Sequence, residues 1–453
     1  MPRHPAPVVL LALAVALFGG VTAAGAQTPT GSVSLFGDYF PNQRDAAELR
    51  ARLFVEEKVE PSPRLRLTIS GFAEGLLSRR PAPGPNTGLQ SVNDGIVRVQ
   101  DANLAVLGSR VDLLAGYARI AWGKLDEIQP TDVINPLDVS RFFFEGRSEA
   151  RLPMLLARAR VHVTERVTLE GVYLPDFRRG RFDQLDEPTS PFNLPVSAAE
   201  DPVVCLAIGC PTAAIPVSDR APAFTVKNAQ GGARASVTTG RVDWSVSAFH
   251  GFESFGLYTP EGVQTIPPVL PPFRPPDPPT VAVVYPRFTM IGADFEAVRG
   301  KWGLRGEVAA FADDNFQSPD LRVVAGRSFD GGVGVDRRAG DYTLSGTVLV
   351  HSESYDSPLA AAGVGRDAIY GRTDVSLVVS ADRTFARERY RLRGFGVYNA
   401  TEASGFLRGI AMASLRDNVA LEASLGWFAG AGRDLVGRFS DSDFAYVRFK
   451  YFF

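Results

Sequence analysis

Apolar and polar residues alternate in many short stretches of this chain. In residues 65–74, Leu65, Leu67 and Ile69 alternate with arginine and threonine, and residues 342–351 repeat the pattern. An α-helix places apolar residues three or four positions apart, whereas successive side chains of a β-strand point to opposite faces. The alternation therefore predicts strands with one apolar and one polar face, each roughly the 9–11 residues of a tilted strand across a bilayer.

The stretch from Asp441 to Phe453 alternates most clearly. Every second residue back from Phe453 is apolar, while the opposite face carries Lys450 and Arg448. An aromatic outward face that closes on an aromatic residue resembles the terminal strand of bacterial outer-membrane barrels. This resemblance implies that the barrel-assembly machinery is a partner, through the strand that ends at Phe453. An ordinary half-buried strand has the same pattern, so the rest of the chain has to decide.

Short and long connections alternate between these stretches. Tight turns, such as residues 108–110 and 239–241, are separated by longer segments. The longer segments are residues 77–94, 123–148, 176–228, 253–282, 313–327, 353–369 and 431–441. Outer-membrane barrels have short periplasmic turns and long outer loops. We therefore predict an all-β fold: a transmembrane antiparallel up-and-down β-barrel of about 18 strands, with 16 as the nearest alternative.

Composition and the apolar runs narrow the class of protein. The 48 Lys and Arg nearly balance the 50 Asp and Glu, so no bulk charge points to nucleic acid as a partner. An apolar run at residues 8–18, followed by Ala-Gly-Ala at 24–26, predicts a secretory signal peptide at 1–26. No later run approaches the ~20 apolar residues of a spanning helix. Residues 27–453 are therefore expected to form a single barrel, the one kind of sheet that satisfies its backbone in lipid.

Two large outer loops are expected, at residues 176–228 and 253–282. The first contains Cys205 and Cys210, the only cysteines, which predict one disulfide in an exported protein. No histidine lies near them, so we predict no metal site there and no cofactor. The second is dense in proline, which favours a stiff polyproline-like surface loop or a ligand for a partner domain.

Residues 117–144 leave a strand and do not return to alternation. They contain W-G-x-x-D from Trp122 and D-V-I-N-P-x-D from Asp132. These motifs resemble those of a poorly characterised family of porin-like Gram-negative outer-membrane barrels, distantly similar to alginate-export barrels. The resemblance implies a barrel with an ordered internal loop and a role in passing a substrate across the outer membrane. It does not carry over a particular substrate.

The same segment contains aromatic residues that are too apolar for a free outer loop. We expect residues 123–148 to fold into the barrel and narrow it, with a structured lip on the rim as the alternative. The candidate lumen and constriction residues are Trp122, Asp126, Asp132, Asn135, Asp138 and Arg141. Calcium held by the three aspartates would be compatible with either arrangement.

Polar faces of the strands line the lumen if the apolar faces meet lipid. This places a basic ladder inward, formed by Arg50, Arg52, Arg64, Arg66, Arg158, Arg160, Arg389, Arg391, Arg393, Arg448 and Lys450. A basic wall concentrates anions near it. Arginines also pair with carboxylates of an inward loop and simply fill space, so anion preference and neutral or mixed selectivity both stay open.

These features favour a porin-like channel for small solutes in the outer membrane of a Gram-negative bacterium, with membrane lipid around it. Two alternatives are an outer-membrane component of an export route for a bulky or apolar molecule, with periplasmic transport partners, and a structural or adhesive barrel. We do not expect an enzyme. After residue 26 the only histidines are His162, His250 and His351, and none has a serine and an acid at a recognisable catalytic spacing.

Overall fold

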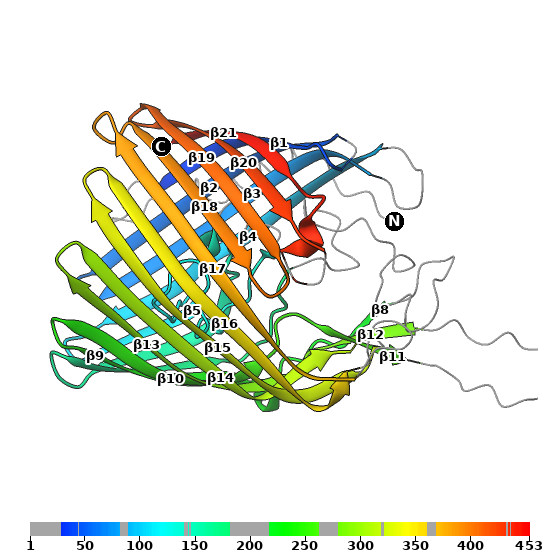
Figure 1. Ribbon diagram of the computed structural model, residues 1–453. Helices are drawn as coiled ribbons and strands as arrows, with labels where there is room; N and C mark the ends of the chain where they lie inside the picture. The colour runs from blue at the N-terminus through cyan, green and yellow to red at the C-terminus, as the bar shows by residue number, and fades with distance from the viewer. Residues whose placement is uncertain are drawn as a thin grey trace, which may run out of the picture.

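One closed sheet forms the body of the protein (Figure 1). The computed structural model describes residues 29–43, 45–81, 89–139, 144, 146–181, 217–261, 280–318, 321–359, 368–431, 434 and 436–453. Within these residues the sheet has 18 strands, and each pairs with its neighbours in antiparallel fashion. The prediction of an 18-stranded antiparallel barrel is confirmed.

The strands follow one another around the barrel in chain order. They are β1 (Thr30–Phe40), β2 (Ala46–Ser62), β3 (Leu65–Pro81), β4 (Leu89–Leu107), β5 (Val111–Ala118), β6 (Met154–His162), β7 (Val167–Leu174), β9 (Gln230–Thr238), β10 (Val242–Phe252), β13 (Arg287–Arg299), β14 (Trp302–Gln317), β15 (Val323–Ala339), β16 (Tyr342–Leu359), β17 (Ile369–Phe385), β18 (Tyr390–Asn399), β19 (Ser404–Arg416), β20 (Val419–Ala429) and β21 (Phe444–Phe452). Helix in the described part comprises α3 (Arg147–Ala150), η1 (Val226–Asn228) and η2 (Gly437–Phe439), and Val139 and Phe144 are also helical. No helix in that part is both long and apolar enough to cross a membrane.

Closure depends on the pairing of β1 with β21. Residues 32–39 pair with residues 445–452. Beyond this ladder, the Gly31 amide donates to the Phe453 carbonyl at 2.9 Å, and the Phe453 amide donates to the Gly31 carbonyl at 3.1 Å. The sheet therefore has no unpaired edge at this seam, which is where an open sheet would expose its backbone.

Alternation along each strand separates the two faces of the wall. On the outside, Leu49 is 51% exposed and Val97 is 58% exposed, whereas the inward Arg50 is 4% exposed. On β21, Val447 lies outside and Tyr446 inside by the same rule. The pattern read from the sequence thus marks an apolar exterior and a charged interior.

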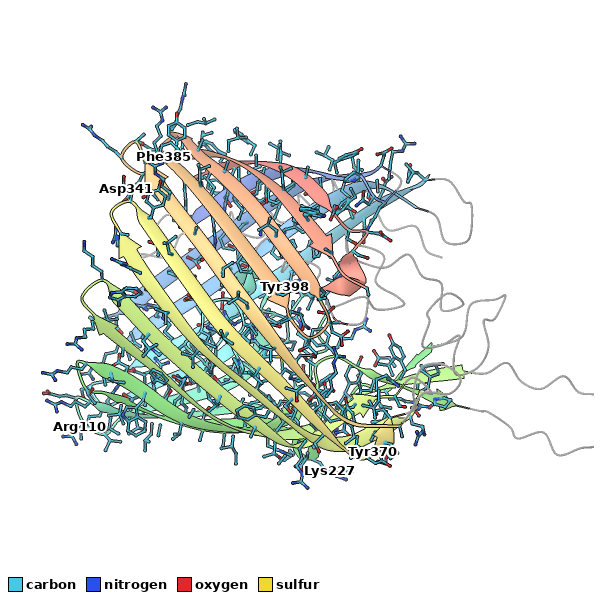
Figure 2. The ribbon with its side chains drawn as sticks, viewed as in Figure 1. Arg110, Lys227, Asp341, Tyr370, Phe385 and Tyr398 are labelled. Carbon is cyan, nitrogen blue, oxygen red and sulfur yellow. The ribbon has the colours of Figure 1, made fainter. Side chains whose placement is uncertain are left out.

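The two ends of the barrel differ in their connections. Tight turns join neighbouring strands at one end, where Gly240 and Gly300 adopt positive φ of 78° and 64°. Figure 2 places Arg110, Asp341 and Phe385 at this end, and Lys227 and Tyr370 at the other. The short turns therefore lie together at one end of the barrel, as predicted.

Three predicted outer loops are shorter than expected because the strands continue into them. The pairing of β3 with β4 extends to Pro81 and Leu89, within the expected loop 77–94. Likewise β14 and β15 extend into 313–327, and β16 and β17 into 353–369. Apolar alternation fades in these stretches while backbone pairing continues.

The two large outer loops meet in a small sheet that the sequence did not predict. β12 (Thr280–Val284) pairs antiparallel with β11 (Leu257–Glu261) and parallel with β8 (Val217–Asp219). Arg220 also forms an ion pair with Glu261 at 2.7 Å. Residues 182–216 and 262–279 lie outside the described residues, and with them Cys205, Cys210 and most of the proline-dense stretch.

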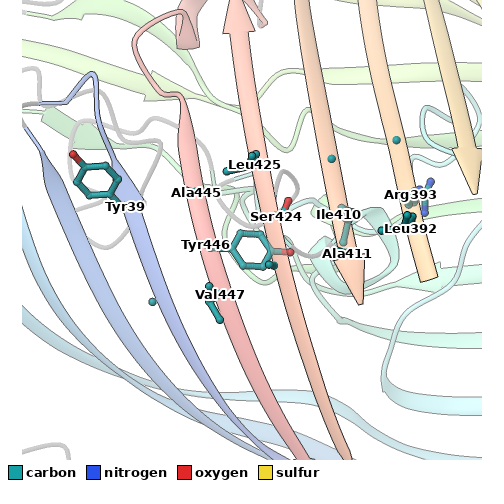
Figure 3. A pocket seen from close by; sticks show the side chains of 14 residues that line it. Tyr39, Leu392, Arg393, Ile410, Ala411, Ser424, Leu425, Ala445, Tyr446 and Val447 are labelled. Atoms are coloured by element: carbon teal, nitrogen blue, oxygen red, sulfur yellow. The ribbon is translucent and has the colours of Figure 1, made fainter. Parts of the chain in front are cut away.

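An apolar groove of ≈ 740 Å³ lies on the outer wall over β1 and β18–β21 (Figure 3). Leu392, Leu425 and Val447 border it. Small residues line its floor, namely Gly37, Gly394, Gly409, Ala411, Ala423 and Ala445. The groove gives no passage into the interior, because the strands beneath it are paired without a break.

Glu253 lies in the connection between β10 and β11, where its amide donates to the Pro286 carbonyl at 2.8 Å. Burial raises the pKa of Glu253 to about 8, and the nearby charge of Asp314 adds to this effect. An acid with a raised pKa in the folded state binds a proton that the unfolded chain releases. The contribution of Glu253 to stability is therefore lost as the pH rises from about 4.5 to about 8.

We expect Glu253→Gln to flatten part of the pH dependence of stability. The urea midpoint of the wild-type barrel in detergent should fall between pH 5 and pH 8.5, because deprotonation places a buried charge beside Asp314. In Glu253→Gln this fall should be smaller. Glu165→Gln, in a tight turn at the opposite end, should behave as wild type. An undiminished fall in Glu253→Gln would contradict the assignment.

Candidate functional site

The segment between β5 and β6, residues 119–153, folds into the barrel and contacts its interior on three sides. On one side Trp122, 1% exposed, packs with inward residues of β6, β7, β10 and β13. Its ring meets that of Phe249 edge-on, with centroids 6.4 Å apart. On a second side Phe144 packs among aromatic residues of β1 and β19–β21. On the third, Leu125 meets residues of β16 and β17.

A buried carboxylate on β14 anchors the first half of this segment. Glu307, 2% exposed, accepts the amides of Lys124 at 2.8 Å and Leu125 at 3.1 Å. It also accepts the amide of Thr131 at 2.6 Å and its hydroxyl at 2.8 Å. Gly123 has φ +98°, and a Cβ there would lie 2.6 Å from a Glu307 oxygen. Glycine is therefore required for the chain to come this close to its anchor.

The side chains of Trp122 and Asn135 hold the segment where it enters and leaves the lumen. The indole N–H of Trp122 donates to Glu170 on β7 at 2.7 Å, and Arg160 donates to the same carboxylate at 2.7 Å. The side chain of Asn135 accepts the amide of Ile120 at 2.7 Å and donates to the Leu152 carbonyl at 2.8 Å. Asn135 thereby ties the residues that enter the lumen to those that leave it.

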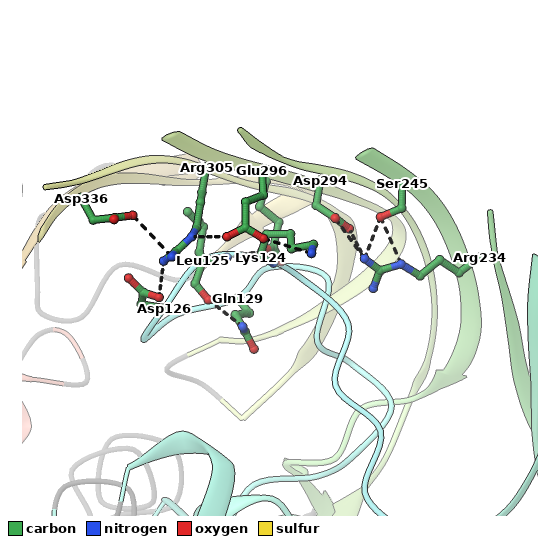
Figure 4. Close-up of polar contacts among 11 residues, drawn as sticks. Lys124, Leu125, Asp126, Gln129, Arg234, Ser245, Asp294, Glu296, Arg305 and Asp336 are labelled. Atoms are coloured by element: carbon green, nitrogen blue, oxygen red, sulfur yellow. Dashed lines mark hydrogen bonds and ion pairs between the residues drawn. The ribbon is translucent and has the colours of Figure 1, made fainter. Parts of the chain in front are cut away.

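Asp126 belongs to a charged network on one wall of the lumen (Figure 4). Arg305 on β14 contacts Asp126 at 2.5 Å, Glu296 at 3.1 Å and Asp336 at 3.4 Å. The ammonium of Lys124 also approaches Glu296, at 3.2 Å. One arginine thus links the segment to three neighbouring strands of the wall.

The other two candidate aspartates contact different arginines. Asp132 lies 2.9 Å from Arg147 and 2.7 Å from Arg151, both within the segment. Asp138, 1% exposed, forms an ion pair with Arg98 on β4 at 2.8 Å. Among the residues that the structure describes, no group of three or more His, Cys, Asp or Glu is arranged to hold a metal ion. Arg141, the sixth candidate, lies outside those residues.

The predicted basic ladder begins with two buried pairs. Arg50 lies 2.8 Å from Asp38, and Arg52 lies 2.6 Å from Glu74. Both arginines are under 9% exposed. Buried guanidinium groups with carboxylate partners fill space in the wall and add little net charge to the lumen.

Three members of the ladder lie at the tight-turn end. Arg64 is in the turn between β2 and β3, and Arg66 pairs with Glu60 at 2.7 Å with both side chains over 40% exposed. Arg389 donates to the carbonyls of residues 414–415 at 3.3 and 3.4 Å. The Arg389 contacts join two neighbouring turns. All three arginines are part of the rim.

Other members face the lumen from the strands. Arg158 and Arg160 lie on the inward face of β6, and Lys450 lies 4.9 Å from the ring of Phe452. Arg391 and Arg393 project from β18 with side chains 45% and 30% exposed. Arg448 contacts Glu422 on β20. The anion preference of this set stays a prediction.

Two cavities flank the inserted segment. One, of ≈ 360 Å³, is mainly polar and lies against β6, β7, β9 and β10, with Lys124, Arg160, Glu170 and Arg234 in its lining. The other, of ≈ 210 Å³, lies against β18–β21. Arg234 is held by Asp294 at 2.8 Å (Figure 4). The interior therefore offers two chemically different spaces, one on each side of the segment.

Comparison with known proteins identifies the family. Residues 97–384 match the family described as "Protein of unknown function (DUF1302)", which is more than half of the 453 residues. The chain belongs to this family. None of the curated proteins that were compared matches this DUF1302 protein. The likeness of its motifs to alginate-export barrels stays a prediction.

Three solved structures are similar to this chain at very low sequence identity. OccAB1 of Acinetobacter baumannii is 6% identical with a TM-score of 0.49, and the match covers 94% of this chain and 95% of that one. OccK7 (OpdD) of Pseudomonas aeruginosa is 9% identical with a TM-score of 0.46 over 94% and 97% of the chains. OmpTdeltaL8, from an outer-membrane protein of Vibrio cholerae, is 10% identical with a TM-score of 0.43 over 95% and 100%.

In the sequence analysis, Glu170 and Glu307 had no assigned role. Both turn out to hold the inserted segment. The available signal in the sequence was an acidic residue within a largely apolar strand. Burying its charge costs free energy unless the charge has a partner, so a partner was to be expected. Glu307 accepts backbone amides 176 to 183 residues away, and Glu170 accepts the indole N–H of Trp122, 48 residues away. A single sequence does not reveal such partners.

We expect Glu307→Gln to loosen the inserted segment. The amide side chain loses the charge that strengthens each bond from residues 124, 125 and 131, so the barrel should lose about 3 kcal/mol of unfolding free energy. Urea unfolding in detergent measures this loss, and trypsin should cleave the variant near Lys124. Glu165→Gln, in a tight turn away from the segment, is the control and should change little. An unchanged midpoint and unchanged cleavage would rule out the anchoring role.

Proposed function

We propose that this protein is a channel in the outer membrane of a Gram-negative bacterium, which passes small solutes past the inserted segment without catalysis. The observation that carries the proposal is the division of the closed sheet into an apolar outer face and a charged inner face. Lipid accepts the first and water the second.

Small anions are the proposed solutes. Arg50 and Arg52 are buried against carboxylates and contribute little field to the lumen. Arg391 contacts Asp382 and Arg393 contacts Glu127, but both arginines are more accessible, at 45% and 30% exposure. Anion preference is therefore assigned to these two residues and not to the ladder as a whole, because accessible charge acts on a passing ion.

Membrane lipid and the barrel-assembly machinery are the proposed partners. Apolar side chains on the outer wall suit the first, and the β21 strand that ends beside Phe453 suits the second. The tight-turn end would face the periplasm, as the turns of outer-membrane barrels do.

Purified protein in planar bilayers should give stepwise conductance. In a salt gradient the reversal potential should indicate preference for anions, because Arg391 and Arg393 raise the local anion concentration. The double variant Arg391→Gln/Arg393→Gln should shift the reversal potential toward zero or toward cation preference. Arg389→Gln, which changes a rim arginine two positions away, is the matched control and should keep the wild-type value.

Two results would count against the proposal in different ways. Absence of conductance from folded protein would remove the channel. Conductance with an unchanged reversal potential in the double variant would keep the channel and remove the role of the β18 arginines.

A further inference from the structure

Arginines alternate with aromatic residues across the outer wall at the tight-turn end of the barrel. The neighbouring strands β14 to β18 contribute one residue each, and every one of these residues begins its strand or lies close to its end. Figure 2 labels two neighbours of these residues, Asp341 and Phe385, at this end. We call the set the outer row, and in order it is Trp302, Arg337, Tyr342, Arg383 and Tyr390.

The strand register places members of the outer row side by side. Trp302 pairs with Arg337, and Tyr342 pairs with Arg383. The guanidinium carbon of Arg337 lies 4.7 Å from the centroid of the Trp302 ring. That of Arg383 lies 4.9 Å from the Tyr342 ring and 5.7 Å from the Phe385 ring. Each arginine therefore has an aromatic neighbour on its own face of the sheet.

The outer row faces away from the lumen. Trp302 is 50% exposed, and Arg337 lies two residues after Val335, which is an exposed apolar residue of the outer wall. The acids next to the two arginines in the sequence, Asp336 and Asp382, lie on the opposite face because side chains alternate along a strand. There they contact arginines of the lumen at 3.4 Å and 2.5 Å. These acids therefore do not neutralise the outer row.

The guanidinium groups of Arg337 and Arg383 have N–H donors without an acceptor in the described part of the chain. Within that part both groups contact rings, and neither donates a hydrogen bond or forms an ion pair. Asp341 and Glu388, in the adjoining turns, contact neither of them. An aromatic ring attracts a positive charge but leaves most of the N–H donors of arginine unsatisfied. Both side chains are exposed, so an acceptor from outside the protein can reach them.

The level of the outer row on the wall fits the headgroup of a lipid. Two residues further from the turns the outward side chains are apolar, as at Leu304, Val335 and Leu344. Acyl chains can cover these residues while a polar head reaches the arginines. Belts of aromatic residues mark the headgroup level of outer-membrane barrels, and the three aromatic members of the outer row have that position.

The two arginines favour one class of headgroup. Guanidinium N–H donors match the oxygens of a phosphate, which every phospholipid carries. A zwitterionic headgroup also carries an ammonium group, which the guanidinium groups repel. A headgroup with a net negative charge lacks this repulsion, so charge complementarity selects an anionic phospholipid.

We propose that the outer row binds a phospholipid with a net negative headgroup. Its phosphate lies against Arg337 and Arg383, and its acyl chains extend over Leu304, Val335 and Leu344. Because the tight-turn end would face the periplasm, this lipid belongs to the periplasmic leaflet. The site rests on the proposed position of the barrel in the outer membrane, and it does not need the channel to conduct.

Quenching of Trp302 fluorescence by lipids with brominated acyl chains tests the site. Trp244→Phe/Trp427→Phe removes the other two exposed tryptophans, and the fourth, Trp122, is buried. In this background and in bilayers that mix phosphatidylglycerol with phosphatidylethanolamine, the binding constant of brominated phosphatidylglycerol should exceed that of brominated phosphatidylethanolamine about fivefold, because its headgroup is a net anion. Equal quenching by the two lipids would overturn the proposal.

Two double variants in the same background separate the outer row from the general charge of the rim. Arg337→Gln/Arg383→Gln should lower the ratio of the two binding constants to about one. Arg338→Gln/Arg389→Gln is the matched control and should keep the preference. It removes the same charge at the same end, but Arg338 alternates with Arg337 along β15, and Arg389 donates to carbonyls of the next turn. Loss of the preference in both variants would contradict the assignment to the outer row.

Two additions to the bilayer samples keep the test decisive if a variant fails to fold, as its mobility before and after heating would reveal. High salt should weaken the preference of the unaltered outer row, because salt screens exposed charges. Glycerol phosphate, which has the phosphate without acyl chains, should leave the quenching unchanged. A preference that high salt leaves intact, or that glycerol phosphate abolishes, would rule out the lipid site.

Lipid preference and conductance separate the two proposals. Stepwise conductance without preference for the anionic lipid overturns the lipid site and leaves the channel in place. A preference that depends on Arg337 and Arg383, without any conductance, supports the site and overturns the channel.

Discussion

Hydrocarbon offers no hydrogen-bond partner to a peptide group, and this constraint governs the whole architecture. A sheet that meets lipid has to pair its first strand with its last, and here β1 pairs with β21 over residues 32–39. Once the sheet is closed, the period of two along each strand assigns every side chain to lipid or to the interior. The charged lumen follows from closure and needs no separate explanation.

Charge inside the barrel is organised mainly as ion pairs. Buried partners such as Arg50 with Asp38 support the wall, whereas Glu307 and Glu170 hold the inserted segment. The guanidinium groups of β18 also contact carboxylates, Asp382 and Glu127, but they are more accessible and lie where the segment and the wall leave space between them. Arginines and carboxylates therefore support the structure where they are buried, and arginines set the proposed selectivity where they are accessible.

The fold could be predicted from the sequence because alternation is a local property of each strand. The strands and the tight turns between them follow from it, and counting the hairpins predicted about 18 strands. Contacts of the inserted segment could not be predicted, since Lys124 and Glu307 are 183 residues apart in the chain. Asp132 is a second example. It contacts Arg147 and Arg151, and its own sequence did not indicate these partners. The sheet formed by β8, β11 and β12 was missed because its strands are only three to five residues long.

The anchors of the inserted segment come from strands made early and late in synthesis. Glu170 is on β7, Glu307 on β14, and Arg408, which donates to the Phe144 carbonyl at 3.0 Å, on β19. The segment itself is translated before all of these strands. Its final contacts therefore require β7, β14 and β19 to be present together in the closed sheet.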